Sequence, residues 1–248
     1  MDIKKNKTLI AIPVFNETNV LNLIQKIQAF PLDILVVDDG STNNFSNELC
    51  SVENIRFIVH SRNIGYGKTI CDAFQYAMQN EYDYLLTIDA DGQHEPEEIQ
   101  LFLDKIPFND FDILSGSRYL SPVGNEFKAP QDRFLINKEI TRIIGRITGY
   151  NVTDTFCGFK AYKVRSLGIL SLTEVGYGMP VQLWLQAWKM GLRVKEIAVK
   201  LIYKDLLKQF TGTLSNPQIR LQYYKDIIEN ELNDSKVVNR LTQTTRSK

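Results

Sequence analysis

Two aspartates one residue apart follow a short apolar segment near the middle of the chain, in the run Tyr-Leu-Leu-Thr-Ile-Asp-Ala-Asp-Gly-Gln-His at positions 84–94. Residues i and i+2 of an extended segment point the same way, so Asp89 and Asp91 bring two carboxylates together. At about 4 Å such charges repel by roughly 4 kcal/mol at an effective dielectric of 20. A divalent cation relieves this repulsion, and Mg²⁺ prefers one or two carboxylates plus phosphate oxygens and water. The pair therefore points to a metal that holds a diphosphate; the alternative is a solvated Asp-rich turn.

Short apolar strands alternate with helical patterns and would position these carboxylates. The expected strands are 8–14, 34–37, 55–60, 84–88 and 113–117, with helices at 20–30 and 66–79 and a helix start at 95–98. In the less regular second half we expect helices at 133–149, 179–190 and 217–232, and strands at 159–163 and 194–202. Continuous apolar strands in strand–helix units predict an α/β fold with a mostly parallel sheet and helices on both faces. No linker divides the chain, so residues 1–232 are expected to form one domain.

The chemically suggestive side chains of the first half lie at or just after the ends of these strands. In strand order they are Pro13, Asn16 and Glu17; Asp38 and Asp39; Arg62, Asn63, Gly65, Gly67 and Lys68; Asp89 and Asp91; and Ser117 and Arg118. The carboxyl ends of parallel strands form the edge where open α/β sheets bind ligands. We therefore expect one site there, with one of Asp38 and Asp39 serving only to cap a turn.

The overall composition excludes several classes of protein. Lys+Arg and Asp+Glu both number 29, so the formal net charge is zero and no global field favours nucleic acid. The 248 residues are 44% hydrophobic and 23% charged, which is ordinary for a globular domain. Three cysteines without a CxxC spacing fit reduced thiols in a cytosol better than a disulfide framework.

No segment of the sequence predicts a membrane span. The N-terminus lacks the apolar core of a signal peptide, and no run approaches the roughly 18 apolar residues that a span needs. The tail, residues 233–248, has four basic side chains and one acidic one and is expected to be disordered, with anionic lipid contact as the alternative. Trp184 and Trp188, four residues apart on one expected helix, are assigned to core packing rather than to a lipid-facing stripe. We expect a cytoplasmic protein that is at most peripheral at the membrane.

Four other kinds of site are not expected from the sequence. Gly67-Lys68-Thr69 resembles the end of a P-loop, but the glycine required five residues before Gly67 is Arg62. No GxGxxG follows the first strand, which argues against a dinucleotide site. With only two histidines, a His-rich zinc centre or a Ser-His-Asp triad is not expected.

The order of the remaining motifs resembles glycosyltransferase family 2, which has the GT-A fold. The motifs are the runs 11–17 (AIPVFNE), 36–42 (VVDDGST), 63–67 (NIGYG), 89–96 (DADGQHEP) and 116–119 (GSRY), and the likeness continues through 154–160 (DTFCGFK) to about Leu232. Gln93-His94, the run 116–119, and Arg133 near Asn137 look most like the dolichyl- or polyprenyl-phosphate mannose synthase branch. The resemblance implies a single Rossmann-like nucleotide-sugar-binding domain.

The resemblance also implies roles for the residues at the sheet edge. Pro13, Phe15 and Glu17 would border the base and ribose, Asp38 or Asp39 would accept hydrogen bonds from the nucleoside, and Gly65 and Lys68 complete this donor-binding set. Asp89 and Asp91, with Gln93 as a candidate third oxygen donor, would hold Mg²⁺ or Mn²⁺ against the diphosphate.

Basic residues are expected to bind phosphate oxygens. Arg118 and Arg133 are suited to bidentate contacts, and the resemblance makes Arg118 part of the catalytic set with Asp91. Surface salt bridges are the alternative for both arginines. Lys208 matches a position where relatives carry a basic residue, although the surrounding sequence departs from their Arg- and Gly-rich pattern.

The implied reaction is an inverting transfer of a sugar, mannose from GDP-mannose in the branch named, to a polyprenyl or dolichyl phosphate. A phosphate acceptor needs no strong base, because its second pKa is about 6. A sugar hydroxyl needs one; Asp154 is then the candidate, with a turn cap as its alternative. Two other functions stay open: a UDP-sugar-dependent transferase that builds polysaccharide or glycolipid, and a non-catalytic nucleotide-sugar-binding module.

Overall fold

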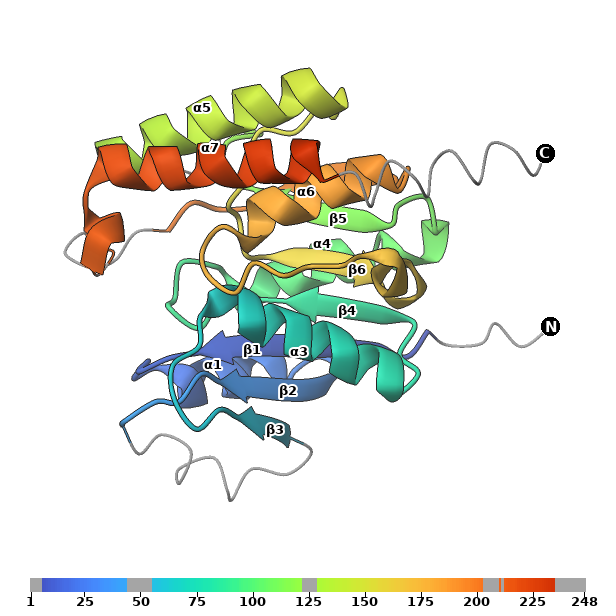
Figure 1. The fold of residues 1–248 in the computed structure, drawn as a ribbon. Helices are drawn as coiled ribbons and strands as arrows, with labels where there is room; N and C mark the ends of the chain where they lie inside the picture. Colours follow the sequence, from blue (N-terminus) through green and yellow to red (C-terminus); the bar gives the residue numbers. More distant parts are fainter. Residues whose placement is uncertain (1–5, 44–54, 122–128, 203–209, 211, 235–248) are drawn as a thin grey trace.

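A seven-stranded sheet forms the centre of the fold (Figure 1). The computed structural model describes residues 6–43, 55–121, 129–202, 210 and 212–234. The strands are β1 (Thr8–Val14), β2 (Asp33–Asp38), β3 (Ile55–Val59), β4 (Tyr84–Thr87), β5 (Ile113–Ser117), β6 (Lys160–Lys163) and β7 (Val194–Ala198). Their order is β3-β2-β1-β4-β6-β5-β7, and all neighbours are parallel except β6, which is antiparallel to both β4 and β5. The predicted mostly parallel α/β sheet is confirmed.

Helices cover both faces of the sheet, as predicted. One core packs α3 (Tyr66–Gln79), α5 (Gln131–Thr148), α6 (Met179–Lys189) and α7 (Pro217–Asn233) on one face, and a second packs α1 (Val20–Ile27) and α4 (Ile99–Leu103) on the other. The short 3₁₀ helices are η1 (Pro96–Glu98), η2 (Ile106–Phe108), η3 (Val164–Ile169) and η4 (Gly212–Ser215). In β1 the side chains alternate between the cores, Leu9 and Ala11 entering the first and Ile10 and Ile12 the second.

The expected elements match the structure closely, and the differences have local causes. Helix α1 ends at Ile27 rather than at residue 30, because Pro31 disfavours helical geometry in the residue before it. Strand β7 ends at Ala198 rather than at residue 202, since its partner Ser117 is the last residue of β5. The helix expected to start at 95–98 begins with η1 before α4 takes over.

The reversed direction of β6 was not predicted, and it matters for the site. A strand antiparallel to β4 starts at the sheet edge where β4 ends, because Thr87 pairs with Lys160. The loop that enters β6 therefore lies beside the segment that leaves β4. Thr87 Oγ1 fixes this approach by donating to the Gly158 carbonyl at 2.7 Å.

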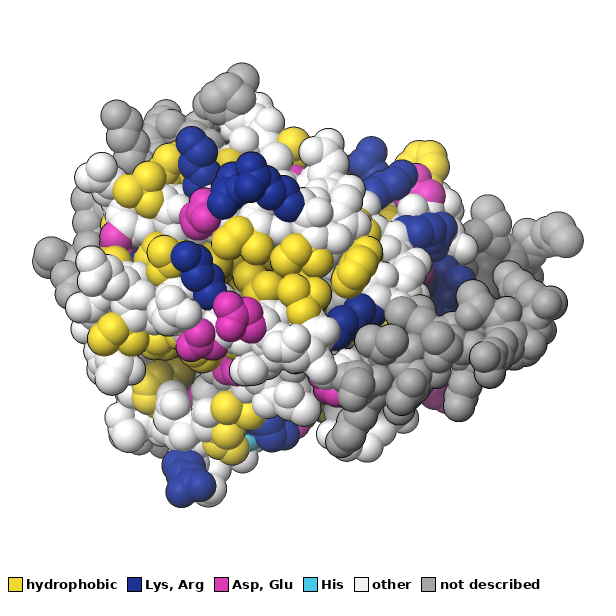
Figure 2. Space-filling model, turned by 45° about the horizontal axis from the view of Figure 1, so that its top comes forward, with side chains coloured by type: hydrophobic (Ala, Val, Ile, Leu, Met, Phe, Trp, Pro, Cys, Tyr) yellow, Lys and Arg dark blue, Asp and Glu magenta, His cyan; other side chains and the backbone are white. Residues whose placement is uncertain are grey.

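Helices α5, α6 and α7 pack against one another and form a layer on one face of the sheet. On its outer side, Figure 2 shows apolar side chains gathered between lysines and arginines, and Leu135 of α5 and Ile219 of α7 are 52% and 49% exposed. No helix among residues 6–43, 55–121, 129–202 and 212–234 is both long and apolar enough to cross a bilayer.

The two tryptophans of α6 lie in different surroundings. Trp184 is fully buried, and its Nε1–H donates to the Thr155 carbonyl at 3.1 Å, whereas Trp188 is 38% exposed. The predicted core assignment therefore holds for Trp184 and is wrong for Trp188, which lies one turn further along, near the end of the helix.

We expect Trp184→Phe to lower the free energy of unfolding by about 2 kcal/mol, because it leaves the buried Thr155 carbonyl without its donor. Trp188→Phe is the matched control and should change it by less than about 0.5 kcal/mol. Urea unfolding followed by far-UV circular dichroism measures both. Equal losses in the two variants would contradict this assignment.

Candidate active site

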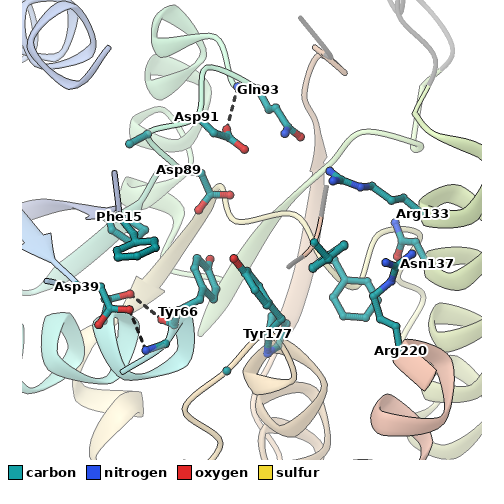
Figure 3. A pocket seen from close by; sticks show the side chains of 18 of the residues that line it. Phe15, Asp39, Tyr66, Asp89, Asp91, Gln93, Arg133, Asn137, Tyr177 and Arg220 are labelled. Carbon is teal, nitrogen blue, oxygen red and sulfur yellow. Dashed lines mark hydrogen bonds between the residues drawn. The ribbon is translucent and has the colours of Figure 1, made fainter. Parts of the chain in front are cut away.

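A pocket of about 670 Å³ opens beyond the carboxyl ends of β1 and β4 (Figure 3). The chain runs from β1 outward to β2 and β3 and then crosses to β4 on the other side of β1, and open α/β sheets bind ligands where the strand order reverses in this way. Ten of the predicted site residues line this pocket: Pro13, Phe15, Glu17, Asp39, Gly65, Asp89, Asp91, Gln93, Arg118 and Arg133.

Four predicted site residues are not among the lining residues. Asp38 accepts a hydrogen bond from the Ser41 backbone N–H at 2.9 Å, so it is the turn-capping member of its pair. Lys68 forms an ion pair with Asp72 on its own helix. Asp154 is fully buried behind the pocket, and Lys208 lies outside the residues that the structure describes.

Asp89, Asp91 and Gln93 form the acidic end of the pocket. Asp91 Oδ1 accepts from the Gln93 backbone N–H at 3.0 Å, whereas Asp89 Oδ1 is buried without a hydrogen-bond partner. Such an orphaned oxygen next to a second carboxylate suits a hard dication, which takes oxygen ligands. In the described part of the chain, no group of three or more His, Cys, Asp or Glu side chains is placed to hold a metal. A cation here would therefore need further oxygens from a ligand or water.

Charges behind Asp89 favour its ionised form. Burial alone would raise the pKa of Asp89, but a hydrogen bond and the charge of His94, together with Lys160 and Arg118, outweigh it and lower that pKa. His94 Nε2 lies 3.5 Å from Asp89 Oδ2. Burial and the nearby Asp89 raise the pKa of Tyr66 well above its ordinary value, so Tyr66 presents a neutral hydroxyl to the pocket.

Gly158, at the end of the loop that enters β6, packs directly against the Asp89 side chain. A Cβ at Gly158 would lie 2.0 Å from Asp89 Oδ2 and 2.4 Å from its Cγ. Only glycine lets the loop approach this closely. The antiparallel course of β6 therefore fixes the position of the carboxylate from behind.

Arg118 and Asp154 form a buried ion pair at the centre of the site. Arg118 Nε and Nη2 donate to the two Asp154 oxygens at 2.7 and 3.0 Å, and Asn137 Nδ2 donates at 2.8 Å. Burial would raise the pKa of Asp154, but the charge and hydrogen bonds of Arg118 and the bond from Asn137 lower it to about 2. Asp154 also accepts from the Phe156 N–H at 3.2 Å, as a turn cap does.

This geometry does not support Asp154 as a general base, because a fully buried carboxylate bound to an arginine cannot reach an acceptor hydroxyl. It also changes the expectation for Arg118. The edge of its guanidinium that carries Nε and Nη2 is used by Asp154, so Arg118 is held in place by this pair while it lines the pocket.

Aromatic and basic side chains form the opposite end of the pocket. Arg133 and Arg220 stack on the Phe210 ring, with 5.0 and 4.4 Å from guanidinium carbon to ring centroid, and Tyr177 meets the same ring edge to face at 5.1 Å. In Figure 3, Arg133 and Arg220 lie across the cavity from Phe15 and Asp39. The pocket thus has an acidic end and a basic, aromatic end.

Several lining residues were not predicted from the sequence: Tyr66, Thr69, Phe156, Tyr177, Phe210, Arg220 and Tyr224. Arg220 and Tyr224 lie one turn apart on the buried face of α7, and a charged residue on the apolar stripe of an expected helix was the available signal. Tyr177 and Phe210 fall outside every expected element and carried no periodic signal.

The chain belongs to glycosyl transferase family 2, whose sequence model matches residues 9–169. It is a glycosyltransferase of that family, as the motifs predicted. It is 31% identical to the polyprenol monophosphomannose synthase of Mycolicibacterium smegmatis over 81% of this chain and 79% of that protein. It is 29% identical to the UDP-N-acetylglucosamine–dolichyl-phosphate N-acetylglucosaminyltransferase of Methanococcus voltae over 78% of this chain and 85% of that protein.

Solved structures share the fold. Glucosyl-3-phosphoglycerate synthase from Mycobacterium tuberculosis, in a complex with Mn²⁺, UDP and phosphoglyceric acid, superposes with a TM-score of 0.68 at 11% identity, covering 92% of this chain and 79% of that chain. The predicted GT-A fold is confirmed by this likeness.

We expect Gly158→Ala to weaken Mn²⁺-dependent nucleotide binding by roughly tenfold or more, because the new Cβ must displace the Asp89 carboxylate. Gly145→Ala in the interior of α5, whose nearest neighbour would be the Tyr150 carbonyl at 3.4 Å, is the control and should bind normally. Isothermal titration with GDP or UDP in manganese buffer measures both. Normal binding by the Gly158 variant would show that this packing is not needed.

We expect Asp154→Asn and Arg118→Gln each to destabilise the fold by about 3 kcal/mol, since each leaves a buried charge without its partner. The double variant should be no less active than the worse single variant, because both act on one unit.

The low pKa of Asp154 adds stability above about pH 4 that is lost as pH falls toward 2, and Asp154→Asn should lack this dependence. Turnover and acid unfolding test the pair; activity losses that multiply would revive an independent catalytic role for Asp154.

Proposed function

We propose that this glycosyltransferase moves a hexose, mannose from GDP-mannose in the first instance, to the phosphate of a polyprenyl lipid with inversion at the anomeric carbon. The observation that carries this proposal is the pocket of about 670 Å³, in which carboxylates line one end and arginines line the opposite end. Relatives named for polyprenol and dolichyl phosphate at 31% and 29% identity support the acceptor class. Their names differ in the sugar, so the donor must be tested directly.

The donor would lie against the β1 and β4 ends of the pocket. Phe15 is 43% exposed at the pocket wall and, with Pro13, offers an apolar surface for the base, while Asp39 and Glu17 offer oxygens to base and ribose. Asp89, Asp91 and Gln93 would hold Mg²⁺ or Mn²⁺, which neutralises charge on the departing nucleoside diphosphate when bound. The neutral hydroxyl of Tyr66 is placed to donate a hydrogen bond toward the same region.

The acceptor phosphate would lie at the basic end. Arg133 supplies a planar guanidinium suited to phosphate oxygens, and the Phe210 and Tyr177 rings, which meet edge to face, give the apolar surface that a prenyl chain needs. Because the two substrates approach from opposite ends, the acceptor attacks the face away from the leaving diphosphate, and this geometry inverts the anomeric centre.

A phosphate acceptor fits the charges of the pocket better than a hydroxyl does. All four carboxylates among the described lining residues, Glu17, Asp39, Asp89 and Asp91, belong to the β1, β2 and β4 ends, and Asp154 is buried and paired. Among the described lining residues, the arginine end offers a hydroxyl no carboxylate that could act as a base, whereas a phosphate is already an anion at neutral pH. Because a polyprenyl lipid is held in a membrane, the proposal includes peripheral contact with the cytoplasmic face of the bilayer.

The test is sugar transfer to polyprenyl phosphate from GDP-mannose and from UDP-sugars, with Mn²⁺ and with chelator. We expect Arg133→Gln to raise KM for the lipid acceptor by roughly tenfold or more, the cost of losing a charged hydrogen bond, with nucleotide affinity unchanged. Arg142→Gln is the control, because Arg142 lies on the same helix but is exposed and paired with Glu139. Transfer to a sugar hydroxyl in preference to the lipid phosphate, or activity that survives both chelation and Asp91→Asn, would rule out this function.

A further inference from the structure

A cluster of four titratable side chains lies behind the nucleotide end of the pocket, and only one of them, Asp39, has a role in the function proposed above. His60 follows β3 and lies between two carboxylates: its Nδ1 is 2.7 Å from Asp39 Oδ1, and its Nε2 is 2.8 Å from Asp72 Oδ2. Lys68, one turn before Asp72 on α3, pairs with the other oxygen of Asp72. The side chains of His60, Asp39 and Asp72 are only 7%, 4% and 14% exposed.

The geometry favours the doubly protonated form of His60, because a carboxylate oxygen lies at hydrogen-bond distance from each ring nitrogen. A neutral imidazole donates from one nitrogen only, so its other nitrogen would point a lone pair at a carboxylate oxygen less than 3 Å away. The doubly protonated ring donates to both carboxylates. It also balances the cluster, since two carboxylates then face one imidazolium and one lysine, and a buried net charge is avoided.

Asp39 transmits this arrangement to the pocket wall. Its Oδ1 also accepts from the Ile64 backbone N–H at 2.9 Å, and its Oδ2 accepts from the Gly65 N–H at 2.8 Å. Both bonds fix the turn that leads into α3. Asn63, Gly65 and Tyr66 of this turn line the pocket, as does Asp39 itself.

The turn has little freedom to compensate for a moved carboxylate. Gly65 has φ of +131°, a conformation that side chains other than glycine rarely adopt. A Cβ on Gly65 would lie 2.4 Å from the Val175 carbonyl, so the turn is packed against the loop before α6. A shift of Asp39 therefore changes the shape of the pocket wall.

We propose that His60 is a positioning residue for the nucleotide: as an imidazolium it clamps Asp39 to Asp72 and so holds the 63–66 turn in its binding shape. His60 does not contact the pocket and acts through Asp39. The identity of the ligand, a nucleoside diphosphate, rests on the proposed function above.

Two variants and a control separate this role from general stabilisation. His60→Gln offers an amide oxygen, which cannot donate, in place of one of the two ring nitrogens, and Asp72→Asn keeps the ring but removes its second anion. Asp112→Asn is the matched control, because Asp112 is likewise buried, with 9% exposed, and accepts from Ser166 Oγ and Arg193, but it precedes β5 at the edge of the sheet away from the pocket.

We expect His60→Gln to weaken GDP or UDP binding in manganese buffer by about tenfold, and Asp72→Asn to weaken it by less. The weaker binding should appear as a higher KM for the donor, with kcat nearly unchanged. Asp112→Asn should lower the melting temperature but bind nucleotide as the wild type does. Nucleotide affinity in the His60 variant equal to that of the wild type would overturn the proposal.

Two readouts do not depend on the ligand. The chain has only two histidines, so the ring signals that vanish in His60→Gln identify His60 in ¹⁵N spectra, and in the wild type at pH 7 they should show two protonated nitrogens. Amide hydrogen exchange at Ile64 and Gly65 should be faster in His60→Gln than in the wild type. A single protonated nitrogen, or unchanged exchange, would refute the clamp. If the wild type binds neither nucleotide, the proposed function fails, and these two readouts still decide whether the clamp exists.

Discussion

The site depends on holding the Asp89 carboxylate ionised while it is largely buried. Its side chain is 26% exposed, and burial of a charge is costly unless neighbouring groups compensate. Here most of the compensation comes through His94 and Lys160, with a further contribution from Arg118 at the pocket wall. Lys160 is itself 2% exposed, and although burial lowers its pKa, its charge helps to lower the pKa of Asp89. Asp89 Oδ1, which has no hydrogen-bond partner, therefore remains available to a ligand or an ion in the pocket.

The same device recurs at two other loops that reach the pocket. Arg118 is held by Asp154, and Asp39 by His60, and in each pair one member lines the pocket while the other is buried behind it. Buried ion pairs contribute little net stability, because desolvation offsets their attraction, but breaking one is costly. Such pairs therefore suit positioning better than stabilisation. The apolar side chains of the two cores stabilise the sheet, and the ion pairs fix the positions of the loops that follow its strands.

The sequence was most informative where the role of a residue follows from its position at the end of a predicted strand. The run of buried residues before Asp89 predicted both β4 and the placement of the acidic pair, and the boundaries of α3 were predicted to the residue. It was least informative where a role depends on a partner distant in the chain. Lys68 is no such case, since Asp72 lies four residues further along the same expected helix and this spacing was an available signal for the ion pair. Asp154 was a candidate base because Arg118 is 36 residues away in the chain. The direction of β6 is a further case, since strand periodicity is the same in either orientation.

The basic end of the pocket depends on the register of α7, which contributes Arg220 and Tyr224 to it. Its buried apolar anchors are only Tyr224, Ile227 and Ile228, a short stripe that a slip of one turn would preserve in part. Buried charges at the two ends oppose such a slip. Arg220 is 2% exposed and bonds to Asp132 and the Leu214 carbonyl, and Glu231 accepts from Gln182 and Gln186 of α6. Displacement by a turn would leave both charges buried without partners, at a cost of several kcal/mol. Because Arg220 also stacks on Phe210, the buried contacts that hold α7 in register also position the aromatic wall of the pocket.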